Sequence, residues 1–145
     1  MLESLDLHHV GPAPHIEMAL ASRLNLITGD NGLGKSFLLE VAWWALTQTW
    51  ASYPARPHPG HADQASIRYR QRGGPEVVSR YDLPAQAFAF AAEPPTGSAI
   101  TIYARVDGSF SIWDPARNAR QRPSPRPTPD RPSAYHFNPV EVWDG

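Results

Sequence analysis

The sequence predicts a mixed α/β domain, in which a mixed sheet surrounds one main helix and an antiparallel β-subdomain follows. Three observations support this fold class. Residues 2–28 hold short apolar segments of strand type, and the next stretch, Phe37 to Trp50, contains no Gly or Pro and has helical periodicity. From residue 65 the period returns to two, between turns rich in Gly and Pro. We therefore expect one domain over residues 1–145, divided into 1–52, 65–114 and 115–133.

Composition narrows the class of protein. A chain of 145 residues without cysteine can form neither disulfides nor thiolate metal sites. The formal net charge of −1 gives no general attraction to nucleic acid or membranes. No apolar run approaches the roughly 20 residues of a membrane span, and the start Met1-Leu2-Glu3 does not resemble a signal peptide. We expect a cytoplasmic protein with no membrane partner.

Three strands are expected before residue 29: Leu2 to His9, Ile16 to Leu20 and Leu24 to Thr28. The first two would form a hairpin that leads into the third. Several histidines lie in or beside the loops of this part of the chain. Because the sequence has no cysteine and no acidic cluster nearby, we interpret them as solvated loop residues and not as metal ligands. They are His8, His9, His15, His58 and His61.

A phosphate-binding pattern separates the third expected strand from the helix. It consists of a glycine, four residues and then Gly-Lys-Ser, in the strand–loop–helix context that such a loop requires. The candidate nucleotide-binding residues are Gly29, Asp30, Asn31, Gly32, Leu33, Gly34, Lys35, Ser36 and Phe37.

Each residue type in this loop has a physical role. The glycines permit positive φ and close approach of the backbone to a phosphate. Successive N–H groups and the start of the helix form a partly positive anion site. Lys35 would reach the β- and γ-phosphates, and the Ser36 hydroxyl would bind Mg²⁺. Of the thirteen basic residues Lys35 is the only lysine, at the position where a compact ammonium suits phosphate.

At these residues the chain resembles a family, the ABC-type P-loop ATPases and above all their SMC/RecF-like branch. Gly29-Asp30-Asn31-Gly32-Leu33-Gly34-Lys35-Ser36 is similar to the Walker A loop of that branch, and the three leading strands resemble the start of such ATPase heads. The resemblance implies ATP and Mg²⁺ as ligands. It also implies sandwiching of ATP between two heads, and roles in DNA repair, chromosome maintenance or phage defence.

The helix, expected over about Lys35 to Ala51, has its apolar residues at three- and four-residue steps. Trp44 lies off this stripe, which indicates a helix that is apolar on more than one side. The proposed stripe consists of Leu38, Leu39, Ala42, Trp43, Leu46 and Trp50.

The clearest hairpin surrounds Val106-Asp107-Gly108. A three-residue loop with Gly108 in the left-handed conformation would pair Ala104 with Phe110 and Ile102 with Ile112. We expect this register because it keeps the apolar face whole. Other strands are expected near Ile67–Tyr69, Val77–Tyr81, Ala87–Ala91 and Ala134–Phe137, with a turn at Glu93–Gly97.

The segment Pro115 to Pro132 holds six prolines and five arginines and is expected to be extended and exposed. Contact with phosphates of DNA is one interpretation. An ordinary surface loop is the other, and it is favoured because no aromatic residues alternate with the arginines to stack on bases.

The hydrolytic half of an ATPase is missing from the sequence. No Leu-Ser-Gly-Gly-like signature occurs, and the acidic residues Asp114 and Asp144 are poor candidates for the Walker B magnesium ligand. This chain is therefore expected to bind ATP, while a second copy or a further chain segment, which we favour, completes the ATPase. The alternatives are a small-molecule kinase and a non-catalytic interaction module with a degenerate loop. A GTPase is disfavoured because no lysine follows Lys35 to form Asn-Lys-x-Asp.

Overall fold

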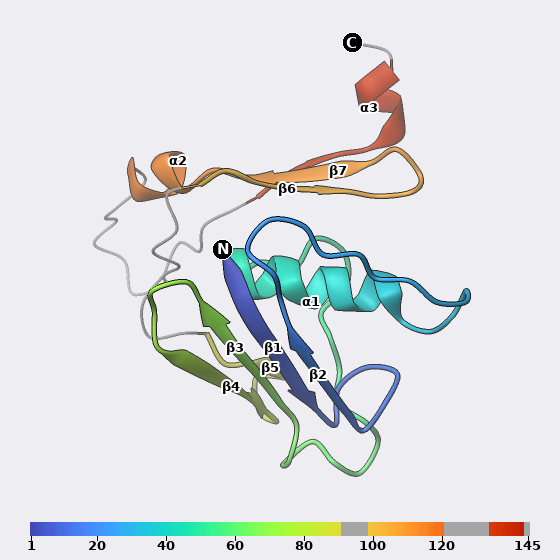
Figure 1. The fold of residues 1–145 in the computed structure, drawn as a ribbon, viewed down its shortest axis with the longest axis vertical. Coiled ribbons are helices and arrows are strands. Elements are labelled where there is room, and N and C mark those ends of the chain that lie inside the picture. Colours follow the sequence, from blue (N-terminus) through green and yellow to red (C-terminus); the bar gives the residue numbers. More distant parts are fainter. Residues whose placement is uncertain (91–98, 121–133, 144–145) are drawn as a thin grey trace.

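The computed structural model describes residues 1–90, 99–120 and 134–143, and shows an α+β fold with one main helix (Figure 1). In chain order the elements are β1 (Leu2–His8), β2 (His15–Ala19), α1 (Lys35–Thr47), β3 (Ser66–Gln71), β4 (Glu76–Asp82), β5 (Ala87–Phe88), β6 (Thr101–Ala104), β7 (Phe110–Trp113), α2 (Pro115–Arg120), β8 (Tyr135–Phe137) and α3 (Pro139–Trp143).

Five strands form the larger sheet, in the order β2-β1-β3-β4-β5. Every strand pair described is antiparallel, so the expected mixed sheet is corrected to two antiparallel sheets. Strand β1, which lies between β2 and β3, alternates: Leu5 and Leu7 are buried, whereas Asp6 and His8 lie on the opposite face. This period of two places one face of the sheet on the core and leaves the other for polar side chains.

Helix α1 packs on the apolar face of this sheet. Its core-facing residues are Leu38, Val41, Trp44 and Ala45, which join the same buried cluster as Leu5, Leu7, Ile67 and Phe88. The helix is apolar on more than one side, as the sequence predicts, and the predicted stripe is confirmed in part: Leu38 is buried in the core, and Ala42, Leu46 and Trp50 pack against it. Trp44, which was placed off the stripe, is fully buried in the core, whereas Leu39, one helical step of 100° from Leu38, is 45% exposed.

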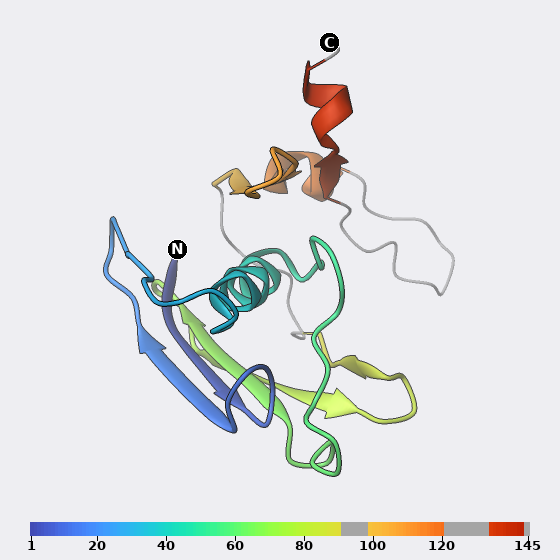
Figure 2. The ribbon, with the colours of Figure 1, turned by 90° about the vertical axis from the view of Figure 1, so that its right-hand side faces the viewer.

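The second sheet, in the order β6-β7-β8, lies on the other side of α1, so the helix forms the middle layer (Figure 2). The predicted hairpin register is confirmed: Ala104 pairs with Phe110, Ile102 pairs with Ile112, and Gly108 has φ 85°. The reason given for it was wrong. Tyr103 contacts Trp43 of α1, whereas Ile102 is 64% exposed on the outer face.

Arg105 joins this second sheet to the helix. Its guanidinium donates hydrogen bonds to the hydroxyls of Ser109 and Ser111 at 3.0 and 2.8 Å and to the carbonyl of Ala51 at 2.8 Å. It also forms an ion pair with Glu40 of α1 at 3.8 Å. One largely buried side chain thus connects β6, β7, α1 and the loop after α1.

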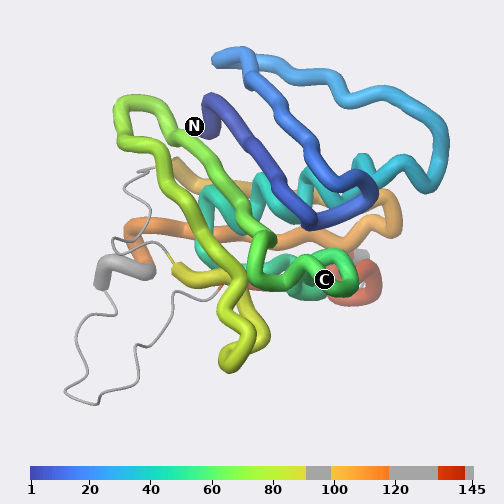
Figure 3. Tube along the Cα trace, turned by 90° about the horizontal axis from the view of Figure 1, so that it is seen from below, coloured from blue at the N-terminus to red at the C-terminus, as the bar shows by residue number. Residues whose placement is uncertain are grey.

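The segment Leu24–Thr28, expected as the third strand, is not a strand. It continues from β2 as an extended trace beyond the edge of the sheet and leads back to α1 (Figure 3). Leu24 and Leu26 are 82% and 84% exposed. A strand is defined by its partners, and no described strand pairs with this segment. The apolar pattern is therefore present without the pairing that it predicts.

Two further expectations are corrected, an extended segment from Pro115 and a strand over Ala87–Ala91. Residues Pro115–Arg120 form helix α2, whose first amides are capped by Asp114; the rest of the Pro/Arg segment and the turn Glu93–Gly97 lie outside the described residues. The expected strand Ala87–Ala91 is the short β5, and β8 forms as predicted.

Pro139–Trp143 is helix α3, which begins with a reciprocal cap between Asn138 and Glu141. None of the described helices has both the length and the apolar character required to cross a bilayer.

Candidate functional site

The loop Gly29–Ser36 connects the exposed segment 24–28 to α1. Gly29, Gly32 and Gly34 all have positive φ, at 144°, 86° and 83°. Gly34 is the N-cap of α1, and a Cβ there would lie 2.5 Å from Cγ of Pro12. At this position a side chain is excluded both by the backbone conformation and by the β1–β2 loop.

Lys35 reaches back over the loop. Its ammonium donates to the carbonyl oxygens of Gly29 at 2.7 Å and of Asp30 at 2.5 Å. Among the described residues it forms no ion pair. The positive charge is therefore placed inside the turn of the loop and is neutralised by no carboxylate there.

The first turn of α1 leaves its amides open. The first hydrogen bond of the helix runs from the amide of Leu38 to the carbonyl of Gly34, at 3.0 Å, so Lys35, Ser36 and Phe37 have no acceptor within the helix. The N-cap has no side-chain hydrogen bond, and the first turn holds no acidic residue. With the helix dipole, this end of α1 has the character of an anion site.

The remaining residues predicted for the site divide into two groups. Asp30, Asn31, Gly32, Leu33 and Ser36 are exposed, so the Ser36 hydroxyl is accessible to solvent next to Lys35. Phe37 is partly buried and has a packing role: a Cβ on Gly11 would lie 2.3 Å from Cε1 of its ring. The loop between β1 and β2 thus packs against the loop 29–36 and the start of α1, through Pro12 and Gly11.

No acidic partner for a magnesium ion at Ser36 is found among the described residues. Asp114, one of the two weak candidates, accepts hydrogen bonds from the amides of Ala116 and Arg117 as the cap of α2. Asp144 lies outside the described residues. The structure thus places Lys35 and Ser36 at the open start of α1, but the strand expected before the loop, Leu24–Thr28, is absent, and no hydrolytic set is found among the described residues.

An apolar groove lies beside the loop-bearing segment. It is lined by side chains from β1, β2, residues 20–27 and the face of α1 that carries Leu39. The segment 21–27 forms one wall with Asn25, whose amide group exchanges two hydrogen bonds with the backbone of Ala21. Four residues of the apolar stripe predicted for α1 line this groove: Leu38, Leu39, Ala42 and Leu46.

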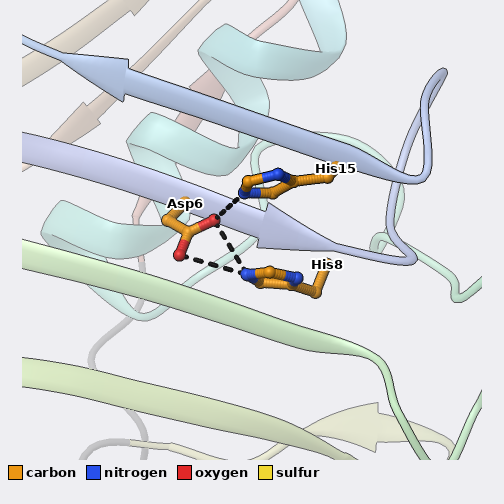
Figure 4. Close-up of side chains that lie close together, drawn as sticks. All are labelled: Asp6, His8 and His15. Carbon is orange, nitrogen blue, oxygen red and sulfur yellow. Dashed lines mark hydrogen bonds and ion pairs between the residues drawn. The ribbon is translucent and has the colours of Figure 1, made fainter.

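Sequence reasoning missed a second group of polar side chains that could hold a ligand. His8 and His15 are not loop residues: they lie opposite each other on β1 and β2, next to Asp6 (Figure 4). Their ligand atoms all lie within 4.8 Å of one another. The signal in the sequence was Asp6-Leu7-His8, since residues two apart on a strand share a face.

His9, which directly follows β1, contacts His58 and His61 from the loop after α1. The rings of His9 and His61 stack at 4.5 Å, and the ring nitrogens of His58 and His61 bond the carbonyls of Gly11 and Pro59. Desolvation, together with the charges of His61 and His58, lowers the pKa of His9. These contacts tie the loop after α1 to the β1–β2 loop.

No known protein family, no curated protein and no solved structure matches this chain. The assignment of a function therefore depends on the residues and geometry described above.

Proposed function

We propose that this chain is the ATP-binding portion of an ABC-type, SMC/RecF-like ATPase, and that Gly29–Ser36 binds Mg-ATP. The observation that carries the proposal is the combination of an uncapped start of α1 with the unneutralised ammonium of Lys35 lying over the same loop. Together they place positive charge and free N–H donors at one exposed point, which is the chemistry that a triphosphate requires.

The roles of the individual residues follow from their positions. The open amides of α1 and the glycine backbone would hold the phosphate oxygens, and Lys35 would exchange its carbonyl acceptors for the β- and γ-phosphates. Mg²⁺, when bound, would supply charge neutralisation between the phosphates, with the exposed Ser36 hydroxyl as its protein ligand. In this proposal the chain positions and neutralises the triphosphate, and it provides no base.

Hydrolysis requires groups that we assign to a second copy or to a further chain segment. The exposure of Leu24 and Leu26, and the apolar groove beside them, supports such a partner, because paired strands would bury these side chains. Action on DNA, in repair, chromosome maintenance or phage defence, and a cytoplasmic location belong to the same proposal. Contact of the arginines in 115–132 with DNA is a separable part of it.

The test is calorimetric titration of the chain with Mg-ATP and Mg-GTP. We expect binding of ATP, with loss of binding in Lys35→Ala. Arg56→Ala is the matched control, because it removes an equal charge from an exposed position in the loop after α1. Unchanged ATP binding in Lys35→Ala, or a preference for GTP, would contradict the proposal.

A non-catalytic interaction module is the second candidate, favoured by the apolar side chains exposed on the outer face of β6 and in the groove. It predicts no nucleotide binding by the unaltered chain, so the same titration separates the two functions. A small-molecule kinase would also bind ATP, but it would transfer phosphate to a small acceptor in the absence of a second copy.

A further inference from the structure

Two histidines and one aspartate lie together on the face of the five-stranded sheet that α1 does not cover. We propose that Asp6, His8 and His15 form a binding site for a divalent transition-metal ion of the zinc class. The proposal is independent of nucleotide binding, because these residues belong to β1 and β2 and not to the loop before α1.

The strand register brings the three side chains together. His8 is paired with His15 across β1 and β2, and Asp6 precedes His8 by two residues on the same strand and face. The rings of His8 and His15 are stacked, with centroids 4.3 Å apart. The intervening Leu7 is fully buried in the core, which fixes the backbone from behind.

The donor atoms converge on one point. The Nε2 of His15 lies 2.8 Å from one oxygen of Asp6, and the Nε2 of His8 lies 3.2 Å from the other. Figure 4 shows the carboxylate of Asp6 to one side of the two stacked rings, next to the Nε2 atom of each. Three ligands on a tetrahedral zinc ion, each at about 2.1 Å, stand about 3.4 Å from one another. The ligand atoms of the three side chains lie within 4.8 Å of one another, so small side-chain rotations would bring them to the distances that an ion requires.

The ligand types select the class of metal. Two imidazole nitrogens and one carboxylate oxygen suit Zn²⁺ and its neighbours Co²⁺, Ni²⁺ and Cu²⁺, whereas Mg²⁺ and Ca²⁺ prefer oxygen alone. This distinguishes the site from any magnesium at Ser36. With three protein ligands on a partly exposed face, the fourth position of a tetrahedral ion is left for water.

The charged cross-strand neighbours of Asp6 cancel each other. Asp6 is paired with Glu17 of β2 on one side and with Arg68 of β3 on the other, so its two nearest charged cross-strand neighbours have opposite signs. The negative charge that attracts a cation is thus that of Asp6 itself. Without an ion, the carboxylate accepts hydrogen bonds from the two imidazoles, which keeps the three side chains near their ligating positions.

A bound ion would connect an edge strand to the centre of the sheet. β2 is the outermost strand, and among the described strands it pairs with β1 only. An ion held by His15 from β2 and by Asp6 and His8 from β1 would therefore resist separation of the two strands. Because an ion that binds the folded state alone stabilises it, zinc should raise the midpoint of thermal unfolding.

The experiment is titration of tag-free, chelator-treated protein with ZnCl₂ in the absence of nucleotide, by calorimetry. We expect one zinc ion per chain and a raised melting temperature. His8→Ala and His15→Ala should each weaken binding by more than about tenfold, since loss of even an outer-shell partner has effects of that size. Titration with CoCl₂ should give the visible absorption of a low-coordinate site, lost in the same variants.

His61→Ala is the matched control, since it removes an exposed histidine from outside the cluster and should leave zinc binding unchanged. Asp6→Asn keeps the shape of the side chain and serves where an alanine variant does not fold. Absence of one-to-one binding, or binding that survives the double variant His8→Ala/His15→Ala, would overturn the proposal. Loss of binding in His61→Ala alone would also overturn it.

Discussion

The ammonium of Lys35 donates a hydrogen bond to the carbonyl oxygen of Gly29 at 2.7 Å, so the lysine spans the loop that precedes its own helix. Both groups of this contact are accessible to solvent, and water can replace each of them. The contact therefore organises the loop without contributing much to the stability of the fold.

This leads to a first prediction about Lys35. Lys35→Met should abolish Mg-ATP binding while changing the free energy of unfolding by less than about 1 kcal/mol, because an exposed hydrogen bond has a small net value. Urea denaturation and calorimetry on the same preparation measure the two effects. A loss of binding accompanied by a large loss of stability would mean that Lys35 acts through folding instead.

A second prediction concerns Gly34. Gly34→Ala forces a side chain into positive φ and places its Cβ against Pro12, whereas Gly32→Ala has a similar φ with no atom within 4 Å. Gly32→Ala should cost about 1–2 kcal/mol of stability from the backbone term alone. Gly34→Ala should cost at least about 1 kcal/mol more. Equal losses in the two variants, measured by urea denaturation, would refute the steric contact with Pro12.

A third prediction concerns Arg105, which connects the second sheet to α1. Arg105→Met should destabilise the chain by about 1–3 kcal/mol, because it removes the hydrogen bonds to Ser111 and to the carbonyl of Ala51 and the ion pair with Glu40. Arg80→Met, at an exposed position of β4, should change stability by less than about 0.5 kcal/mol. If the two variants unfold at the same denaturant concentration, Arg105 does not hold the layers together.

A fourth prediction is a pH dependence. Desolvation, and then the charge of Arg105, lowers the pKa of His136 below its usual 6.5. The unfolded chain therefore takes up this proton first as the pH falls. The contribution of neutral His136 to the stability of the fold is therefore fully present above pH 6.5, and it is lost as the pH falls through the lowered pKa of the folded chain.

Denaturation at several pH values between 5 and 8 checks this linkage. In His136→Gln the fall in stability on acidification should be shallower than in the unaltered chain, with the remainder due in part to His9. Identical pH profiles for the two proteins would exclude a contribution from His136.

A fifth prediction contrasts two kinds of leucine. Leu24→Ser and Leu26→Ser should each alter stability by less than about 0.5 kcal/mol, because both side chains are exposed. Leu7→Ala, in the fully buried centre of β1, should cost about 2–5 kcal/mol. A marked loss in the serine variants would show that this chain buries Leu24 or Leu26 in a self-association that denaturation disrupts.

Local rules predicted much of the fold. The hairpin register at Asp107-Gly108 follows from turn chemistry, and β1, β2, β3 and β4 follow from alternation. Leu24–Thr28 has the same apolar pattern, yet it is no strand, because strand formation depends on a partner that local pattern does not specify. The exposure of Ile102 could not be predicted for the same reason. It depends on which face of the β6–β7 hairpin packs against α1, and local pattern does not specify that face.

The candidate sites differ in the same way. Gly29–Ser36 is contiguous, so its spacing is readable as a candidate phosphate-binding loop, although the strand expected before it does not form. Asp6, His8 and His15 meet only through the β1–β2 register. The Gly11-Pro12 connection predicts the hairpin but does not fix that register. The alternation of Asp6 and His8 was readable, but the position of His15 opposite His8 required the structure.

The consecutive residues Trp43 and Trp44 pack against different parts of the molecule. Trp43 lies by Tyr103 of the second sheet, with ring centroids 6.3 Å apart, while Trp44 stacks on Trp50 at 5.4 Å and contacts Tyr69 and Phe88 in the main core. The chain also contains Trp50, Trp113 and Trp143, so each of the two tryptophans is observed as a difference. The emission lost in Trp43→Phe reports on the docking of the second sheet, and the emission lost in Trp44→Phe reports on the main core.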